Sequence, residues 1–187
     1  MGLAAEVNQL GPVQRDEALM RQALELLGVP EPLHVLDRLD AAGVGPDAVG
    51  VVGGDPEDIP VAALVVDSSG QLLSQARNSR HGTVDPTAHA EVLALRAAAE
   101  RTGSWRLDGC TLVVTLEPCP MCAGAAVSAR VARVVFGAWN PRYGAAGSVW
   151  DLLRDRRLHH RPEVVAGVLA EQAAAPLAAF FERRRQG

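Results

Sequence analysis

The sequence predicts an α/β domain of three layers, α/β/α, with a mixed five-stranded sheet in the middle. Two apolar runs at residues 59–66 and 71–76 are joined by the turn Asp67-Ser68-Ser69-Gly70, which predicts a hairpin. Further along, the apolar runs 111–116 and 131–136 flank a helix over 120–130, and this βαβ pattern predicts parallel strands. A hairpin followed by such units gives a mixed sheet with helices on both faces. The chain has 187 residues, 48% of them hydrophobic, which is enough for one core.

The first 58 residues are expected to form a helix and a surface insertion. Apolar residues at helical spacing predict a helix over 14–27, which Gly28 and Pro30 end. Residues 33–39 could form a short second helix. The following stretch, GVGPDAVGVVGGDPED, is rich in Gly, Pro and acidic residues, so we expect a loop. We therefore divide the chain into residues 1–58 and a main part, residues 59–187, within one structural domain.

The main part continues with alternating helices and strands. A helix over 87–101 begins at Asp85-Pro86-Thr87 and ends at Gly103. After the βαβ unit, residues 139–148 are expected to be a loop, 149–153 a short helix and 163–169 a strand. A last helix over 170–185 contains Pro176, which predicts a kink or a late start.

The net charge of −4 is unevenly distributed along the chain. The first 60 residues hold three Arg and eleven acidic residues, whereas the remainder holds fifteen Arg and eleven acidic residues. A compositional bias toward Arg explains this pattern. The alternative is that guanidinium groups gather on one face that contacts nucleic acid, because they suit phosphates and stack on bases.

The sequence favours a cytoplasmic protein with no membrane association. The N-terminus lacks a basic patch followed by a long apolar stretch, so we expect no secretory signal. No apolar run approaches the ~20 residues that a membrane helix needs. Three cysteines, an odd number, argue against a disulfide framework and leave metal binding open.

The strings AHAEV and EPCPMC place His89, Cys119 and Cys122 at two predicted helix starts. Zinc prefers such ligands, and a catalytic zinc site combines three of them with a position for water. Cys110 starts a predicted strand and is expected to be a core residue. The sequence therefore predicts one zinc ion per chain in a hydrolytic site.

Two glutamates compete for the role of proton shuttle. Glu91 follows His89 by two residues, at the first turn of a helix, from where it can reach a substrate beside the metal. It could bind the metal directly, but we favour proton transfer. Glu117 ends a strand beside Pro118 and is expected to be a structural hydrogen-bond acceptor.

From residue 59 to residue 185 the chain resembles the tRNA-specific adenosine deaminase (TadA) family. The strings that carry the resemblance are IPVAALVV, NSRHGTVDPTAHAEVLALR, GCTLVVTLEPCPMCAGA, GAAGS and RRLHHRPEVVAGVL. The pattern H-x-E…P-C-x-x-C is the signature of zinc deaminases. The resemblance implies a cytidine-deaminase-like fold and hydrolytic deamination of adenosine to inosine at the wobble position in the tRNA anticodon loop. It also implies a homodimer, with an interface from the helix 120–130 and the strand after it.

The resemblance also assigns roles to individual residues. His89, Cys119 and Cys122 would be the zinc ligands and Glu91 the proton donor. The substrate would be contacted by Asn78 at the base edge, Ile59, Pro60 and Val61 in the pocket wall, the backbone at Ala90 and Pro118, Asn140 near ribose and phosphate, and Phe180 or Phe181 as a stacking ring.

The chain departs from the family pattern in several places. The segment 28–58 is longer than its counterpart, and Ala62 replaces a glycine, which is expected to narrow the pocket wall. Asn140 stands where the family has Asp, and its other interpretation is that it caps the turn before Pro141.

Two other functions remain open at this stage. The motif EPCPMC also suits a deaminase of a free nucleobase such as guanine, although GAAGS and HHRPEV favour the tRNA enzymes. A zinc-stabilised binding module without catalysis would have a fourth protein ligand and would not need Glu91.

Overall fold

The computed structural model of the protein describes residues 10–28 and 49–186. In this part of the chain, a six-stranded sheet has the order β1-β3-β2-β4-β5-β6. β2 pairs antiparallel with β3 and with β4, whereas β1 runs parallel to β3, and β4, β5 and β6 are parallel. The strands are β1 (Val51–Val52), β2 (Ala62–Val66), β3 (Leu72–Arg77), β4 (Thr111–Leu116), β5 (Arg133–Ala138) and β6 (Glu163–Val165).

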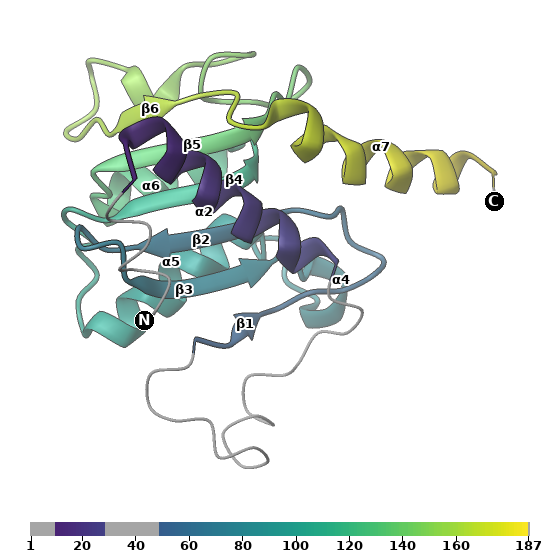
Figure 1. Cartoon of the computed structure of the whole chain (residues 1–187), viewed down its shortest axis with the longest axis horizontal. Coiled ribbons are helices and arrows are strands. Elements are labelled where there is room, and N and C mark those ends of the chain that lie inside the picture. Colours follow the sequence, from purple (N-terminus) through teal and green to yellow (C-terminus); the bar gives the residue numbers. More distant parts are fainter. Residues whose placement is uncertain (1–9, 29–48, 187) are drawn as a thin grey trace, which may run out of the picture.

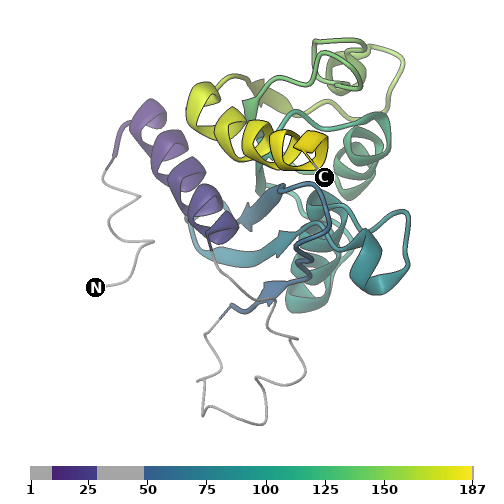
Figure 2. The ribbon, with the colours of Figure 1, turned by 90° about the vertical axis from the view of Figure 1, so that its right-hand side faces the viewer.

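Helices cover both faces of this sheet, which confirms the three-layer prediction (Figures 1 and 2). α2 and α7 lie on one face, and α5 and α6 lie on the other. The helices are α2 (Pro12–Leu27), α4 (Arg80–Thr83), α5 (Ala90–Thr102), α6 (Pro120–Ala129) and α7 (Ala170–Gln186), with a 3₁₀ turn, η1 (Leu152–Arg154). None of the helices in the described ranges has the length and apolarity needed to cross a membrane.

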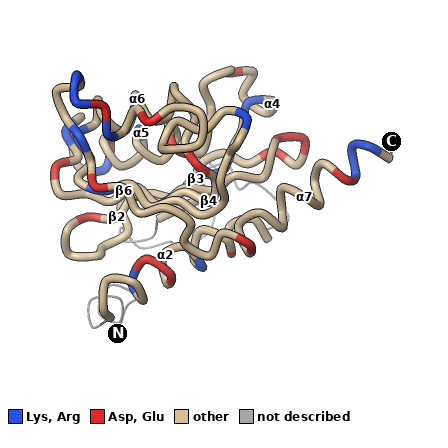
Figure 3. Tube along the Cα trace, turned by 90° about the horizontal axis from the view of Figure 1, so that it is seen from above, with Lys and Arg blue, Asp and Glu red and all other residues tan. Residues whose placement is uncertain are grey.

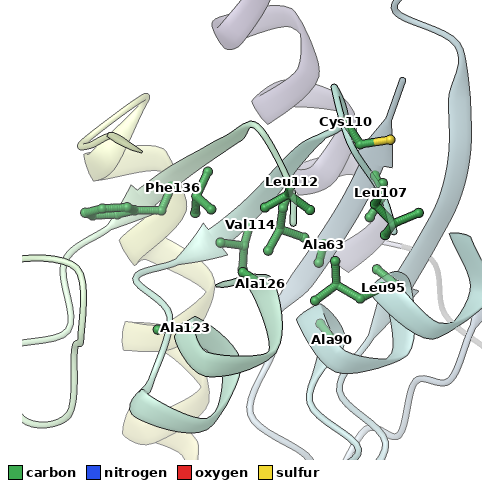
Figure 4. Close-up of a cluster of buried hydrophobic side chains, with 14 of the residues drawn as sticks. Ala63, Ala90, Leu95, Leu107, Cys110, Leu112, Val114, Ala123, Ala126 and Phe136 are labelled. Carbon is green, nitrogen blue, oxygen red and sulfur yellow. The ribbon is translucent and has the colours of Figure 1, made fainter. Parts of the chain in front are cut away.

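The larger core cluster packs α5 and α6 against the sheet (Figure 4). Ala90, Ala123 and Ala126 are fully buried on the helices, where their small side chains allow close approach to the strands. Leu112 and Val114 of β4 belong to the same cluster and project from the sheet toward the helices. The packing fixes the N-terminal ends of α5 and α6 against the strand ends, where the chemistry-bearing residues lie.

The structure adds one strand to the five that the sequence predicts. β1 belongs to a stretch that was expected to be loop, and its two residues pair with Gln75 and Ala76 of β3. Gly53 follows with φ +71°, and a Cβ there would lie 2.7 Å from the carbonyl oxygen of Arg77. Glycine is required at this close approach, so the end of the insertion is packed against the sheet.

Other expectations about elements have mixed outcomes. The parallel βαβ unit is confirmed by the β4–β5 register. The last helix begins at Ala170 and continues through Pro176, so the late start was wrong. The short helix considered for residues 33–39 lies outside the described residues.

Candidate active site

Three donor atoms converge where α5 and α6 begin. His89 is the N-cap of α5, Cys119 is the N-cap of α6, and Cys122 lies in the first turns of α6. The His89 Nδ1 atom lies 3.8 Å from the Cys119 Sγ atom and 3.5 Å from the Cys122 Sγ atom. All three donor atoms lie within 4.8 Å of one another.

This spacing fits zinc. A tetrahedral ion with zinc–sulfur bonds of about 2.3 Å and zinc–nitrogen bonds of about 2.05 Å separates nitrogen from sulfur by roughly 3.6 Å and the two sulfurs by roughly 3.8 Å. The observed nitrogen–sulfur distances bracket the first value. The donor set therefore fits a zinc ion bound by two thiolates and one imidazole, with a position left for a water molecule.

The three donors perturb one another's protonation. A hydrogen bond from Cys122 and a second one with His89 lower the pKa of Cys119 to about 4, against the effect of burial. The same hydrogen bond to Cys119, together with burial, raises the pKa of Cys122. The hydrogen bond with Cys119 also raises the pKa of His89. These shifts follow from the short distances between the three donor atoms.

Glu91 lies in the first turn of α5, two residues after His89, and is only 4% exposed. Burial raises the pKa of its carboxyl group and outweighs hydrogen bonds from its own backbone N–H and from Cys122. A carboxyl group with a raised pKa can hold and release a proton near neutral pH. Glu91 therefore has the environment of a proton carrier.

Glu117, at the end of β4, is a structural acceptor, as the sequence predicts. Its carboxylate accepts hydrogen bonds from the backbone N–H groups of Asn140, Ala146 and Ser148 at 2.9 Å and from the Ser148 hydroxyl. Burial would raise its pKa, but these donors together lower it. Glu117 thus organises the loop after β5.

Asn78 ties the start of α5 to the strand region before β2. Its Oδ1 atom accepts a hydrogen bond from the Ala90 N–H at 2.8 Å, and its Nδ2 atom donates to the Ile59 carbonyl at 3.0 Å. An amide has two N–H donors and two acceptor lone pairs, so one of each remains for a ligand.

A cavity of about 830 Å³ connects these residues. It is large enough for a nucleotide. The predicted site residues that line it are Ile59, Val61, Asn78, His89, Glu91, Cys119 and Asn140.

Four predicted substrate contacts, Pro60, Ala90, Pro118 and Phe180, are not in the cavity wall. The Ala90 N–H is bonded to Asn78, and the Pro118 carbonyl accepts a hydrogen bond from the Ala145 N–H at 2.8 Å. Phe180 is 5% exposed and packs inward, whereas Phe181 is 47% exposed and lines the cavity. Adjacent residues on a helix point about 100° apart, so only one of the two rings can face the cavity.

Two departures from the family pattern now have structural explanations. Ala62 packs into the smaller core cluster beneath α2, so the expected narrowing of the pocket wall was wrong. The Oδ1 atom of Asn140 accepts a hydrogen bond from the Tyr143 N–H at 3.1 Å, which confirms that it caps this turn. Asn140 also lines the cavity.

Sequence reasoning missed part of the cavity mouth. Arg80, Arg142 and Tyr143 line it, although no motif singles them out. Trp139, Arg184 and Arg185 also line it.

Comparison with known proteins agrees with this geometry. Residues 51–138 match the family model described as the cytidine and deoxycytidylate deaminase zinc-binding region. The tRNA-specific adenosine deaminase of Bacillus subtilis (strain 168) is 46% identical over 129 residues, which are 69% of this chain and 80% of the relative. The chain belongs to the tRNA-specific adenosine deaminase family. All three candidate zinc ligands and Glu91 lie inside the matched range.

Solved structures show the same deaminase fold. One comes from studies of A-to-I editing by tRNA:A34 deaminases at the wobble position of transfer RNA, with 38% identity and a TM-score of 0.60 over 63% of this chain and 84% of that chain. A guanine deaminase from Nitrosomonas europaea is 27% identical with a TM-score of 0.63, over 91% of this chain and 84% of that chain. The fold is therefore shared by tRNA-specific and nucleobase-specific enzymes.

Proposed function

We propose that this protein is a zinc-dependent hydrolase that deaminates adenosine to inosine at the wobble position of tRNA. The observation that carries the proposal is a cluster of three zinc-type donors, His89, Cys119 and Cys122, of which His89 and Cys119 line a cavity of nucleotide size together with the buried carboxyl group of Glu91. The 46% identity to the tRNA-specific enzyme of Bacillus subtilis supports tRNA as the substrate. The overall reaction adds water across the C–N bond and releases ammonia.

His89, Cys119 and Cys122 hold the zinc ion in this proposal. The chemistry that zinc supplies when bound is Lewis-acid activation of the water that adds to the purine ring. Glu91 would accept one proton from that water on its carboxylate oxygen and deliver it to the ring nitrogen. It would then accept the second proton from the added hydroxyl group and deliver it to the leaving amine, which departs as ammonia while the carbonyl group of inosine forms.

The other residues orient the base. Ile59 and Val61 provide an apolar wall, and the free N–H and lone pair of Asn78 suit the edge of a purine. Glu117 holds the loop that carries Asn140 and Tyr143 in place beside the cavity.

We also propose that the protein acts as a homodimer in the cytoplasm. The interface expected from the sequence needs one correction, because β5 is paired on both sides, with β4 and β6, and its strand edges are occupied. α6 remains available, and Met121 on it is an exposed apolar side chain. Sedimentation of the purified zinc-loaded protein tests this, and a monomer at micromolar concentration would contradict it.

The test of the proposed activity is a deamination assay on an anticodon stem–loop and on free adenine, guanine and cytosine. We expect inosine in the stem–loop and no ammonia from the free bases. Ammonia release from free guanine without inosine in the stem–loop would instead identify a nucleobase deaminase.

A further inference from the structure

The mouth of the cavity is rich in positive charge. Glu91 and Glu117, the acidic residues of its lining, are both buried deep in the site. The basic lining residues are Arg80, Arg142, Arg184 and Arg185. Figure 3 shows basic residues at α4 and at the C-terminal end of α7, two elements far apart in the sequence. An anionic group that approaches the cavity therefore meets guanidinium groups first.

Two of these arginines are held by neighbouring acidic residues of one turn. The Arg80 Nε atom donates to the Asp58 carboxylate at 3.3 Å, and the Asp58 side chain is 1% exposed. An Arg184 NH2 group donates to the Glu57 carbonyl at 2.7 Å and lies 3.3 Å from the Glu57 carboxylate. The Arg184 guanidinium also stacks on the Phe180 ring, 4.7 Å from its centroid. Both guanidinium groups are thus positioned before a ligand arrives.

The turn that holds them is itself well anchored. The Asp55 carboxylate accepts a hydrogen bond from the Glu57 N–H at 2.8 Å, and its carbonyl accepts one from the Asp58 N–H at 3.1 Å. Asp58 accepts a further hydrogen bond from the His81 N–H at 3.0 Å. Residues 51–58 therefore contact three elements. β1 pairs with β3, Asp58 binds α4 through Arg80 and His81, and Glu57 binds Arg184 of α7.

The free donors of this arginine pair suit phosphate. Arg80 uses its Nε–H on Asp58, so both of its NH2 groups remain available at the cavity. A planar guanidinium binds two oxygens of a phosphate at once, and a preorganised one loses less entropy on binding. A free nucleobase has no phosphate, whereas a nucleotide within RNA has one on each side.

We propose that Arg80 and Arg184 determine specificity by binding the backbone phosphates that flank the target adenosine, and that Asp58 and Glu57 are their positioning residues. This inference rests on the proposed function and adds to it the feature by which the cavity selects RNA over free bases. It also gives a role to the end of the insertion.

The first experiment measures the salt dependence of binding. A labelled anticodon hairpin is titrated with zinc-loaded Glu91→Ala protein at several salt concentrations, alone and combined with Arg80→Ala or Arg184→Ala. Each arginine change weakens binding about 10- to 100-fold. Each also reduces the slope of log Kd against log salt by about 0.7, the value for one phosphate contact to a single strand.

A matched control distinguishes the loss of a specific phosphate contact from a general loss of positive charge. Arg106 is paired with Asp108 at 2.8 Å and does not line the cavity. Arg106→Ala leaves the affinity and the salt slope unchanged. In the active protein, Arg80→Ala and Arg184→Ala raise KM for the hairpin and leave kcat unchanged.

The positioning role of Asp58 has its own readout. Asp58→Asn still offers an oxygen to the His81 N–H but loses the ion pair with Arg80. Asp58→Asn weakens hairpin binding when Arg80 is present, and it causes no further loss of affinity when Arg80 is already replaced by Ala. A purely structural role would give additive losses and a lower melting temperature in both backgrounds.

Neutral methylphosphonate linkages placed one at a time beside the target adenosine locate the contacts. A linkage that weakens hairpin binding to the protein with both arginines no longer changes the affinity of the variant that lacks the arginine bound to that phosphate. Equal sensitivity in all proteins, or salt slopes that do not change, would overturn the inference. Hairpin binding without deamination by the natural protein would contradict the proposed function alone, and a hairpin that is not bound at all would contradict both.

Discussion

Glu91 and Glu117 line the same cavity from two neighbouring elements, the start of α5 and the end of β4, and both are buried. Burial raises the pKa of the Glu91 carboxyl group, whereas the donors of Asn140, Ala146 and Ser148 lower that of Glu117 despite its burial. The same type of side chain can thus carry a proton at Glu91 and is held as an anion at Glu117. The hydrogen-bond donors around each carboxyl group, and not its burial alone, separate the two roles.

The largest expected effect comes from removing a zinc ligand, because the Glu91 region is proposed to act only beside the metal. Cys122→Ala leaves two of the three donors, and we expect most of the zinc and all measurable deamination to be lost. Metal analysis of the purified variant checks this. Full zinc occupancy in Cys122→Ala would remove Cys122 from the ligand set.

The next effect tests how tightly the Glu117 region is packed. A Cβ on Gly144 would lie 2.1 Å from the Glu117 Oε2 atom, and that carboxylate is held by its donors. We expect Gly144→Ala to lower the free energy of unfolding by about 3 kcal/mol.

Gly124 is the matched control for this substitution, because it is exposed in α6 and a Cβ there meets nothing within 4 Å. Gly124→Ala is expected to be neutral or to stabilise by up to about 1 kcal/mol. Chemical denaturation of the two variants gives both values. Equal stabilities would mean that the Glu117 carboxylate can move aside.

A smaller effect is expected when Glu117 itself becomes neutral. Glu117→Gln keeps the size of the side chain but directs an NH2 group at backbone N–H donors. We expect a loss of about 1–3 kcal/mol. For a chain of this length, that loss lowers the melting temperature by roughly 2–12 °C. A melting temperature equal to that of the natural protein would contradict the structural role.

The smallest effect concerns a partly buried carboxylate, paired with an exposed arginine, whose pKa is also lowered. Hydrogen bonds from Arg157 lower the pKa of Asp155 to about 2; the Asp155 side chain is 18% exposed and its partner Arg157 is 88% exposed. Its contribution is present above the ordinary pKa of 3.8 and is lost as pH falls through about 2. Because solvent screens the pair, we expect Asp155→Asn to shift the melting temperature by less than about 2 °C at pH 7. A larger shift would mean that a carboxylate with a lowered pKa has a structural role even when its arginine partner is exposed to solvent.

The sequence predicts the parts of this molecule whose signals are local. β4 and the helix after it follow from an apolar run and a proline at the helix start, and the zinc donors follow from their residue types and spacing. β1 could not be found because two valines between glycines carry no periodicity. Its pairing depends on the close approach of Gly53 to β3, which is a tertiary contact.

The same limit applies to the cavity mouth. Phe180 and Phe181 are alike in sequence, and only the packing of α7 decides which ring is buried. Arg80 lies in a string that the family shares, but nothing in that string shows that its side chain reaches the cavity, because this depends on Asp58, which lies 22 positions earlier in the chain. Contacts of this kind become visible only when the fold brings separate segments together.

The central claim is that Glu91 carries the proton and Glu117 holds the loop. The measurement that tests it most directly is kcat on an anticodon stem–loop for Glu91→Gln and Glu117→Gln, each with its zinc content determined. We predict that Glu91→Gln keeps its zinc and loses about 10²–10⁴-fold in kcat, whereas zinc-loaded Glu117→Gln stays within about tenfold of the natural protein. A kcat for Glu91→Gln within tenfold of the natural value, or an equal loss in zinc-loaded Glu117→Gln, would contradict the account.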